Sequence, residues 1–191
     1  LLHTRRNADG LARVAAAASG QGAEVETLLG DLGEPETGPA LVERALDRFG
    51  RLDRLVANAG FADKRGIEAL GPGGLDESLG PIAGGFFHLV RAASPHLPAG
   101  GRVVAVSSFV AHRFPHDGDR FPASAAAKAA LEALVKALAA EVAPRGVTVN
   151  AVSPGYTEKD PGAHAALTSE RWAKVTALAQ QDPARGAAAA G

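Results

Sequence analysis

The sequence predicts an α/β fold in which a parallel, doubly wound sheet lies between two layers of helices. Three observations predict it. Strand-like and helix-like apolar patterns alternate, glycine- or proline-bearing segments separate many of them, and residues 102–106 form a continuously apolar strand. The 191 residues are enough for one buried core and too few to argue for two. We therefore expect a single three-layer domain over residues 1–191.

The first half of the chain has three strand patterns and two helical ones. Asn7 is a good N-cap, and apolar residues then recur at helical spacing as far as Gly20. The second helical pattern ends at Gly50, because glycine readily adopts the positive φ that terminates a helix. The predicted strands are residues 1–3, 23–29 and 52–57.

The second half continues this alternation. Residues 61–75 are rich in glycine and are expected to form a loop, and a third helix then carries apolar residues from Phe86 to Leu97. After the apolar strand at 102–106, small and apolar residues predict a long helix from about Ala123 to Ala143. Residues 147–152 are the next strand.

Composition and charge exclude several classes of function. The formal net charge is −1, so no global field attracts nucleic acid or an anionic membrane. No apolar run approaches the roughly 20 residues that span a bilayer, and the first residues do not resemble a signal peptide. The absence of cysteine excludes disulfides, thiolate catalysis and cysteine-based zinc sites. We expect a cytoplasmic protein without a metal site.

Small, polar or glycine-bearing residues follow five of the predicted strands. In an open parallel sheet, ligands bind beyond the carboxyl ends of the strands, and small residues let a ligand approach the backbone closely. These strand ends therefore predict one shared ligand site. They are Thr4-Arg5-Arg6, Gly30-Asp31-Leu32, Asn58-Ala59-Gly60, Ser107-Ser108 and Ser153-Pro154-Gly155.

Residues 56–60, residues 102–108, Lys128 in its helix and residues 147–155 resemble the signature segments of the short-chain dehydrogenase/reductase family. The resemblance runs in order as far as about Thr157. It implies a Rossmann-like fold and an oxidoreductase that moves a hydride between nicotinamide and a small-molecule carbonyl or alcohol. It also implies a homodimer or homotetramer. The cofactor-binding residues that it implies are Asp31, Leu32, Asn58, Ala59, Gly60, Lys128, Pro154, Gly155 and Thr157.

Arg5 and Arg6 bear on the choice of cofactor. Family members that use NAD tend to carry an acidic residue at this strand end, whereas a basic residue suits the 2′-phosphate of NADP. Two guanidinium groups stand there, and arginine forms strong paired hydrogen bonds with phosphate. We expect NADP(H) rather than NAD(H); the alternative is that both arginines are solvated surface residues.

The family's catalytic pattern, Tyr-x-x-x-Lys, is broken at Ser124, four residues before Lys128. A serine hydroxyl is much less acidic than a phenol, so it is a poor direct replacement as proton donor. Ser108 matches the family serine that polarises the substrate carbonyl, and we prefer it to Ser107. Ile82 falls near the place of the helix asparagine that completes the usual proton relay.

The predicted catalytic set is therefore Ser108, Ser124 and Lys128, and each has an alternative. Lys128 could belong to a solvated stripe with Glu132 and Lys136 at helical spacing. Other candidate proton donors are Tyr156, His112 and His116, although rim positions suit them better.

The resemblance also predicts a substrate lid at residues 158–181, with Trp172 and Tyr156 as substrate-contacting residues. The lid's alternative is a helix packed on the core. The family's glycine-rich phosphate loop is absent, and the sequence starts at Leu1 without methionine, so we expect the chain to be incomplete at both ends.

Three hypotheses for function remain. The first is an NADP(H)-dependent oxidoreductase. The second is a nucleotide-binding scaffold or sensor with impaired catalysis, which Ser124 and Ile82 favour. The third is a structural subunit without cofactor, against which the presence of Asp31, Asn58 and Lys128 argues.

Overall fold

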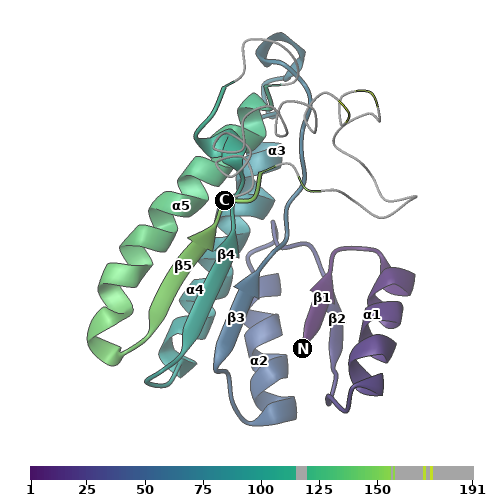
Figure 1. The fold of residues 1–191 in the computed structure, drawn as a ribbon, viewed down its shortest axis with the longest axis vertical. Helices are drawn as coiled ribbons and strands as arrows, with labels where there is room; N and C mark the ends of the chain where they lie inside the picture. The colour runs from purple at the N-terminus through teal and green to yellow at the C-terminus, as the bar shows by residue number, and fades with distance from the viewer. Residues whose placement is uncertain (115–119, 156, 158–169, 171–172, 174–191) are drawn as a thin grey trace.

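The computed structural model describes residues 1–114, 120–155, 157, 170 and 173, and in them strands and helices alternate as predicted (Figure 1). The described strands are β1 (Leu2–Thr4), β2 (Thr27–Leu29), β3 (Arg54–Ala57), β4 (Arg102–Val106) and β5 (Thr148–Val152). The described helices are α1 (Ala8–Gly20), α2 (Thr37–Phe49), α3 (Asp76–Leu79), α4 (Gly85–Ala93) and α5 (Pro122–Val142), with a π-helical turn at Gly80–Gly84 between α3 and α4. None of these helices has the length and hydropathy of a membrane-spanning segment.

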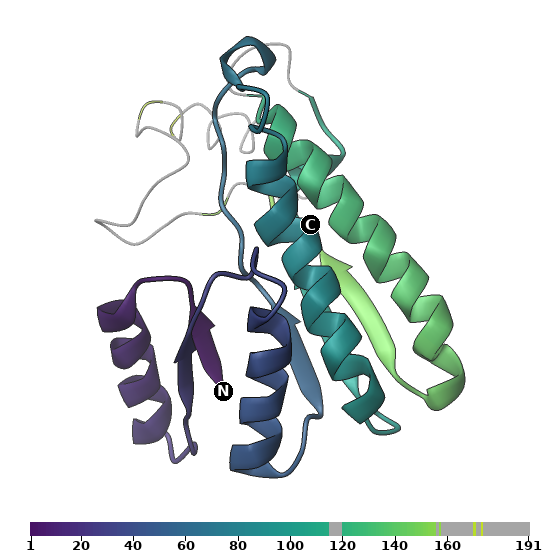
Figure 2. The ribbon, with the colours of Figure 1, turned by 180° about the vertical axis from the view of Figure 1, so that it is seen from behind.

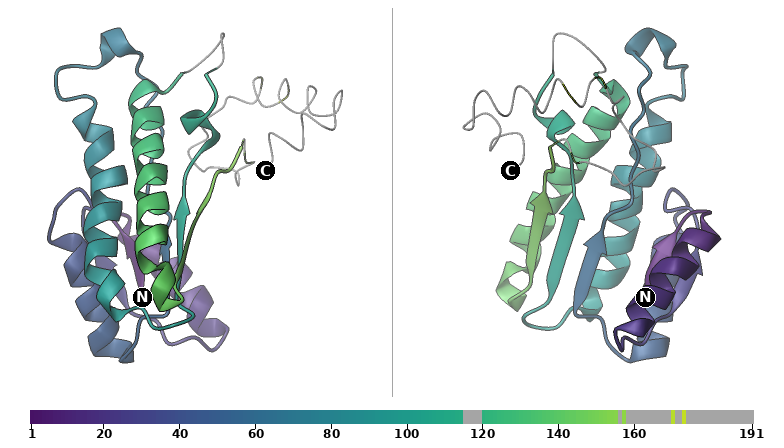
Figure 3. Two further views of the ribbon diagram at one scale, coloured as in Figure 1. Left: turned by 90° about the vertical axis from the view of Figure 1, so that its left-hand side faces the viewer. Right: turned by 45° about the vertical axis from the view of Figure 1, so that its right-hand side comes forward.

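The paired strands are parallel throughout, and they form two groups. In one, β1 pairs with β2; in the other, β3, β4 and β5 pair in that order. Helices α2, α4 and α5 lie side by side over one face of the strands (Figure 2), while α1 lies on the opposite side, beside β1 and β2 (Figure 3). This arrangement confirms the expected α/β class, with helices on both faces of parallel strands.

The main core lies between the strands β3–β5 and the helices α4 and α5. Phe86 and Leu131 are each 2% exposed, and Val103 on the central strand is fully buried. A second apolar cluster joins α2 to α4 through Leu41 and Leu89. The two helices approach closely at Gly38. A Cβ atom at this position would lie only 2.7 Å from the backbone nitrogen of Leu89, so only glycine fits.

Several predicted boundaries differ from the structure, beginning with β1, which runs from Leu2 to Thr4 rather than over residues 1–3. Strand β2 begins at Thr27 rather than residue 23, because its partner β1 begins at Leu2, which lies opposite Thr27. Strand β3 begins at Arg54 rather than residue 52. The segment before Phe86 is already helical from Asp76, although its middle turn is π-helical. Pro81 lies in this turn and has no N–H to continue a regular α-helical ladder.

Candidate functional site

Lys128 lies where the carboxyl ends of β3 and β4 meet. It projects from the second turn of α5, is 7% exposed, and donates a hydrogen bond of 2.5 Å from Nζ to the carbonyl oxygen of Val106. A Cβ atom on Gly60 would lie 3.0 Å from the same Nζ, so the amine rests against the turn after β3. Burial lowers the pKa of Lys128, since a dry environment disfavours the charged form. The alternative of a solvated stripe is therefore wrong for this residue.

The end of β4 is tied to α5 by one carboxylate. Ser107, which is 4% exposed, donates a hydrogen bond of 2.5 Å from Oγ to Oε1 of Glu132, and Nε2 of His112 lies 2.9 Å from the same oxygen. Ser108 caps the 3₁₀ turn Phe109–Ala111, where its Oγ accepts a long hydrogen bond of 3.4 Å from the Val110 N–H. The hydroxyl of Ser107 is therefore more firmly engaged than that of Ser108.

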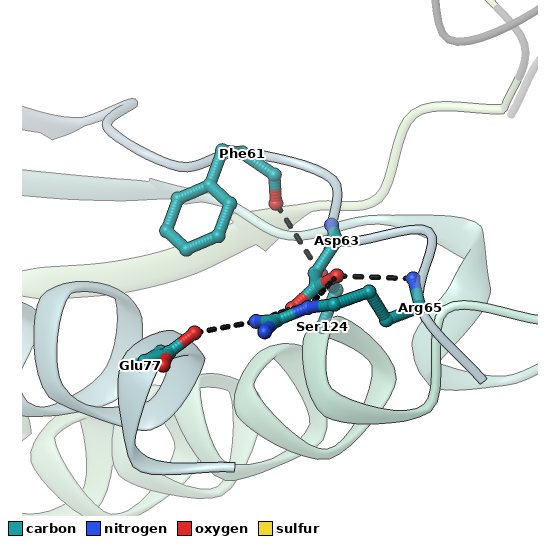
Figure 4. A network of polar contacts seen from close by, with 5 residues as sticks. All are labelled: Phe61, Asp63, Arg65, Glu77 and Ser124. Atoms are coloured by element: carbon teal, nitrogen blue, oxygen red, sulfur yellow. Dashed lines mark hydrogen bonds and ion pairs between the residues drawn. The ribbon is translucent and has the colours of Figure 1, made fainter. Parts of the chain in front are cut away.

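Ser124 lies in the first turn of α5 and is 3% exposed. Its Oγ accepts a hydrogen bond of 2.9 Å from the backbone N–H of Asp63 and donates one of 3.4 Å to the carbonyl oxygen of Phe61. Both partners belong to the loop that follows Gly60, and Figure 4 shows this loop lying against the start of the helix.

The loop after Gly60 is held from its other side by an ion-pair network (Figure 4). The Arg65 guanidinium donates hydrogen bonds to both carboxylate oxygens of Asp63 and also to Glu77 on α3. Asp63 is 8% exposed, and its hydrogen bonds from Arg65 hold the pKa of that carboxyl below its usual range. Nothing in the sequence pattern singled out these three residues, since Asp63 and Arg65 lie in a glycine-rich loop.

Arg5 and Asp31 meet at the ends of β1 and β2. Nη1 of Arg5 lies 3.6 Å from Oδ2 of Asp31, whose other oxygen accepts a hydrogen bond of 2.9 Å from the N–H of Gly33. Arg6 is exposed beside them. Leu32 is half-buried and packs against the start of α4. A Cβ atom on Gly85 would lie 2.8 Å from the Cβ of Leu32.

The remaining predicted site residues are distributed as follows. The turn Asn58-Ala59-Gly60 is exposed directly after β3, and Ile82 is buried on the π-helical turn. Pro154 and Gly155 are half-buried after β5, and Thr157 is exposed. The backbone N–H of Phe109 donates to the carbonyl of Pro154, which joins the segment after β4 to the segment after β5. Tyr156, Trp172, His116 and most of the predicted lid at 158–181 lie outside the described residues.

This geometry brings the five polar strand ends and a buried lysine to the carboxyl-end edge of the parallel strands (Figure 1). Within the described part of the chain, no group of three or more histidine, aspartate or glutamate side chains is suited to hold a metal ion. Residues 1–188 match the family model described as enoyl-(acyl carrier protein) reductase. The chain belongs to the short-chain dehydrogenase/reductase family. The resemblance drawn from the strand ends is thus confirmed.

Two curated relatives and one solved structure show the extent of the likeness. An uncharacterized oxidoreductase from Methylorubrum extorquens is 34% identical over 166 residues, which cover 85% of this chain and 63% of that protein. The 1-cyclohexenylcarbonyl-CoA reductase of Streptomyces collinus is 32% identical over 161 residues, covering 84% of this chain and 56% of the reductase. The chain thus spans less than two thirds of either relative.

The solved structure is a short-chain dehydrogenase from Burkholderia cenocepacia in complex with NADP. It superposes on this short-chain dehydrogenase/reductase chain with a TM-score of 0.83 at 31% identity, covering 91% of this chain and 69% of the other.

Proposed function

We propose that the protein is an NADP(H)-dependent oxidoreductase that transfers a hydride between nicotinamide and a small-molecule carbonyl or alcohol. The observation that carries this proposal is the buried amine of Lys128, held beside Gly60 at the carboxyl ends of β3 and β4. An ammonium group has three donors, and the bond to Val106 uses one of them, so two remain for a ribose hydroxyl pair.

The residues that follow β1 and β2 suit the adenosine part of NADP. Arg5 and Arg6 offer exposed guanidinium groups for the 2′-phosphate, and Asp31 with Leu32 offers a carboxylate and an apolar surface for the adenine. NADP in the Burkholderia cenocepacia relative supports this choice. Bound nicotinamide supplies the hydride, and the protein orients the reactants.

In this proposal Ser108 polarises the substrate oxygen and Lys128 fixes the nicotinamide ribose, while Pro154, Gly155 and Thr157 close over the carboxamide. Reduction adds a hydride to carbon and a proton to oxygen, and a water molecule or a loop side chain supplies that proton. Orientation and polarisation alone sustain substantial catalysis where the proton donor is weak.

A homodimer or homotetramer belongs to the same proposal. Four of the exposed alanines on α5 suit such an interface, because small side chains permit close contact between helices across a twofold axis. They are Ala129, Ala133, Ala137 and Ala140.

A nucleotide-binding scaffold or sensor with impaired catalysis is the second candidate. The engagement of the Ser124 hydroxyl by the loop, and the burial of Ile82 in the core, favour it. Neither residue offers the acidic hydroxyl or amide of an ordinary family proton relay.

Thermal unfolding with and without nucleotide tests the proposal. NADPH is expected to raise the melting temperature of the intact protein more than NADH does, because only a ligand that binds the folded state stabilises it. Lys128→Met should abolish most of this protection, and Lys136→Met, an exposed residue on the same helix, should not. Protection by neither nucleotide would overturn both candidate functions. Where NADPH binds, oxidation of NADPH across a panel of carbonyl compounds separates the enzyme from the sensor.

A further inference from the structure

The single proton of the Ser124 hydroxyl is already directed to a protein acceptor. A serine hydroxyl has one donor and two acceptor sites. Here the proton points to the carbonyl oxygen of Phe61, and the oxygen accepts the N–H of Asp63. With 3% of the residue exposed, Ser124 is enclosed by the loop to which it is bonded. A hydroxyl in this position is suited to holding backbone rather than to giving up a proton.

The same loop is also fixed from outside. Asp63 accepts hydrogen bonds of 3.0 Å from both the backbone N–H and Nε of Arg65, and the guanidinium extends to Glu77 on α3 (Figure 4). Charge-assisted, paired hydrogen bonds are the strongest that side chains form. The loop is therefore bonded on one side to Ser124 in the first turn of α5 and on the other to Glu77 of α3.

We propose that Ser124 and Arg65 are positioning residues that together clamp the loop Phe61–Arg65 across the start of α5. This loop continues directly from Gly60, on which a Cβ atom would lie 3.0 Å from the amine of Lys128, so the clamp fixes the turn on which the ribose contact depends. The inference rests on the proposed function for its kinetic and NADPH-affinity readouts, but not for its hydrogen-exchange readout.

Kinetics of Ser124→Ala distinguish a positioning residue from a proton donor. Loss of one hydrogen bond to the loop is expected to weaken NADPH binding by about 2- to 10-fold while kcat changes by less than about 3-fold. A lost proton donor would instead lower kcat by about 100-fold or more and alter its pH profile. That second result would overturn the proposal.

Arg65→Ala supplies the second variant. Because both residues hold one loop, we expect the effects of Ser124→Ala and Arg65→Ala on NADPH affinity to be non-additive in the double variant. Ser124→Thr retains a hydroxyl and should restore affinity. Strictly additive effects, or failure of threonine to rescue, would contradict a shared clamp.

Amide hydrogen exchange tests the clamp without any nucleotide. In Ser124→Ala the amide of Asp63 should exchange at least about 5-fold faster, because its acceptor is gone, while the amides of the α5 interior are unchanged. Ser19→Ala, at an exposed serine on α1, is the matched control. An unchanged Asp63 amide would refute the clamp. Absence of NADPH binding would instead refute the proposed function, and the exchange result would still stand.

Discussion

Ser107 is joined to Glu132 by a hydrogen bond of 2.5 Å, and His112 reaches the same carboxylate oxygen at 2.9 Å. One side chain of α5 therefore holds both ends of the segment 107–112, on which Ser108 sits. Lys128 lies one turn earlier on the same helix. In the proposed enzyme, α5 thus sets the position of the carbonyl-polarising serine relative to the ribose-binding lysine.

Glu132→Ala is expected to lower kcat by about 10- to 100-fold. Without this carboxylate Ser108 shifts, and a small misplacement of a group that aligns the reactants lowers the rate by about this factor. NADPH affinity should change by less than about 2-fold, since Lys128 keeps its bond to Val106. Steady-state kinetics and nucleotide titration check this. Glu141→Ala, at an exposed glutamate of α5, is the control. A kcat equal to that of the control would show that the carboxylate does not position Ser108.

Burial of Lys128 makes the stability of the fold depend on pH. Burial lowers its pKa in the folded state below the ordinary lysine value of 10.5, so between the folded and the ordinary pKa the unfolded chain binds more protons. Stability must therefore rise with pH through this window and level off above it. Urea unfolding from about pH 7 to about pH 10 should show that the free energy of unfolding of the wild type rises relative to that of Lys128→Met as the pH rises. The free energy of unfolding of Lys136→Met should instead change with pH in the same way as that of the wild type.

Removing Arg5 and Arg6 together should weaken NADPH binding by about 10- to 100-fold and leave NADH binding nearly unchanged. The reason is that only NADPH carries the 2′-phosphate, and a hydrogen bond to a charged group contributes about 1.5–3 kcal/mol. Loss of the Arg5–Asp31 pair itself matters little, because both side chains are partly exposed. Fluorescence titration measures both affinities. Arg13→Ala, exposed on α1, serves as control, and equal losses for the two nucleotides would contradict the assignment.

Ser78 on α3 is fully buried, and its Oγ has no hydrogen-bond partner among the described residues. An unpaired buried hydroxyl costs about 1–3 kcal/mol, and alanine is also a better helix former. Ser78→Ala should therefore raise the urea midpoint with an unchanged slope, whereas Ser19→Ala should shift it little. A lower midpoint for Ser78→Ala would mean that this hydroxyl has a stabilising role.

Several elements could be predicted from local pattern because their formation depends on nearby residues. Strand β4 has the boundaries that its apolar run predicts, and α5 begins and ends within one residue of the expected positions. Asn7 caps α1 through its side chain, as its residue type indicates. The helical start at Asp76 was missed because glycine and proline there favour loops locally, while packing on α5 and its neighbours holds the turns.

The amino-acid order by itself determined the alternation of elements, the parallel class, the family and the polar strand ends, since each depends on residues a few positions apart. Only the tertiary structure decided which polar groups meet. Asp63 and Ser124 are 61 positions apart, and Ser107 and Glu132 are 25 apart. Such pairs form because helix packing on a twisted sheet brings distant backbone segments within hydrogen-bonding distance, and no local pattern encodes that distance.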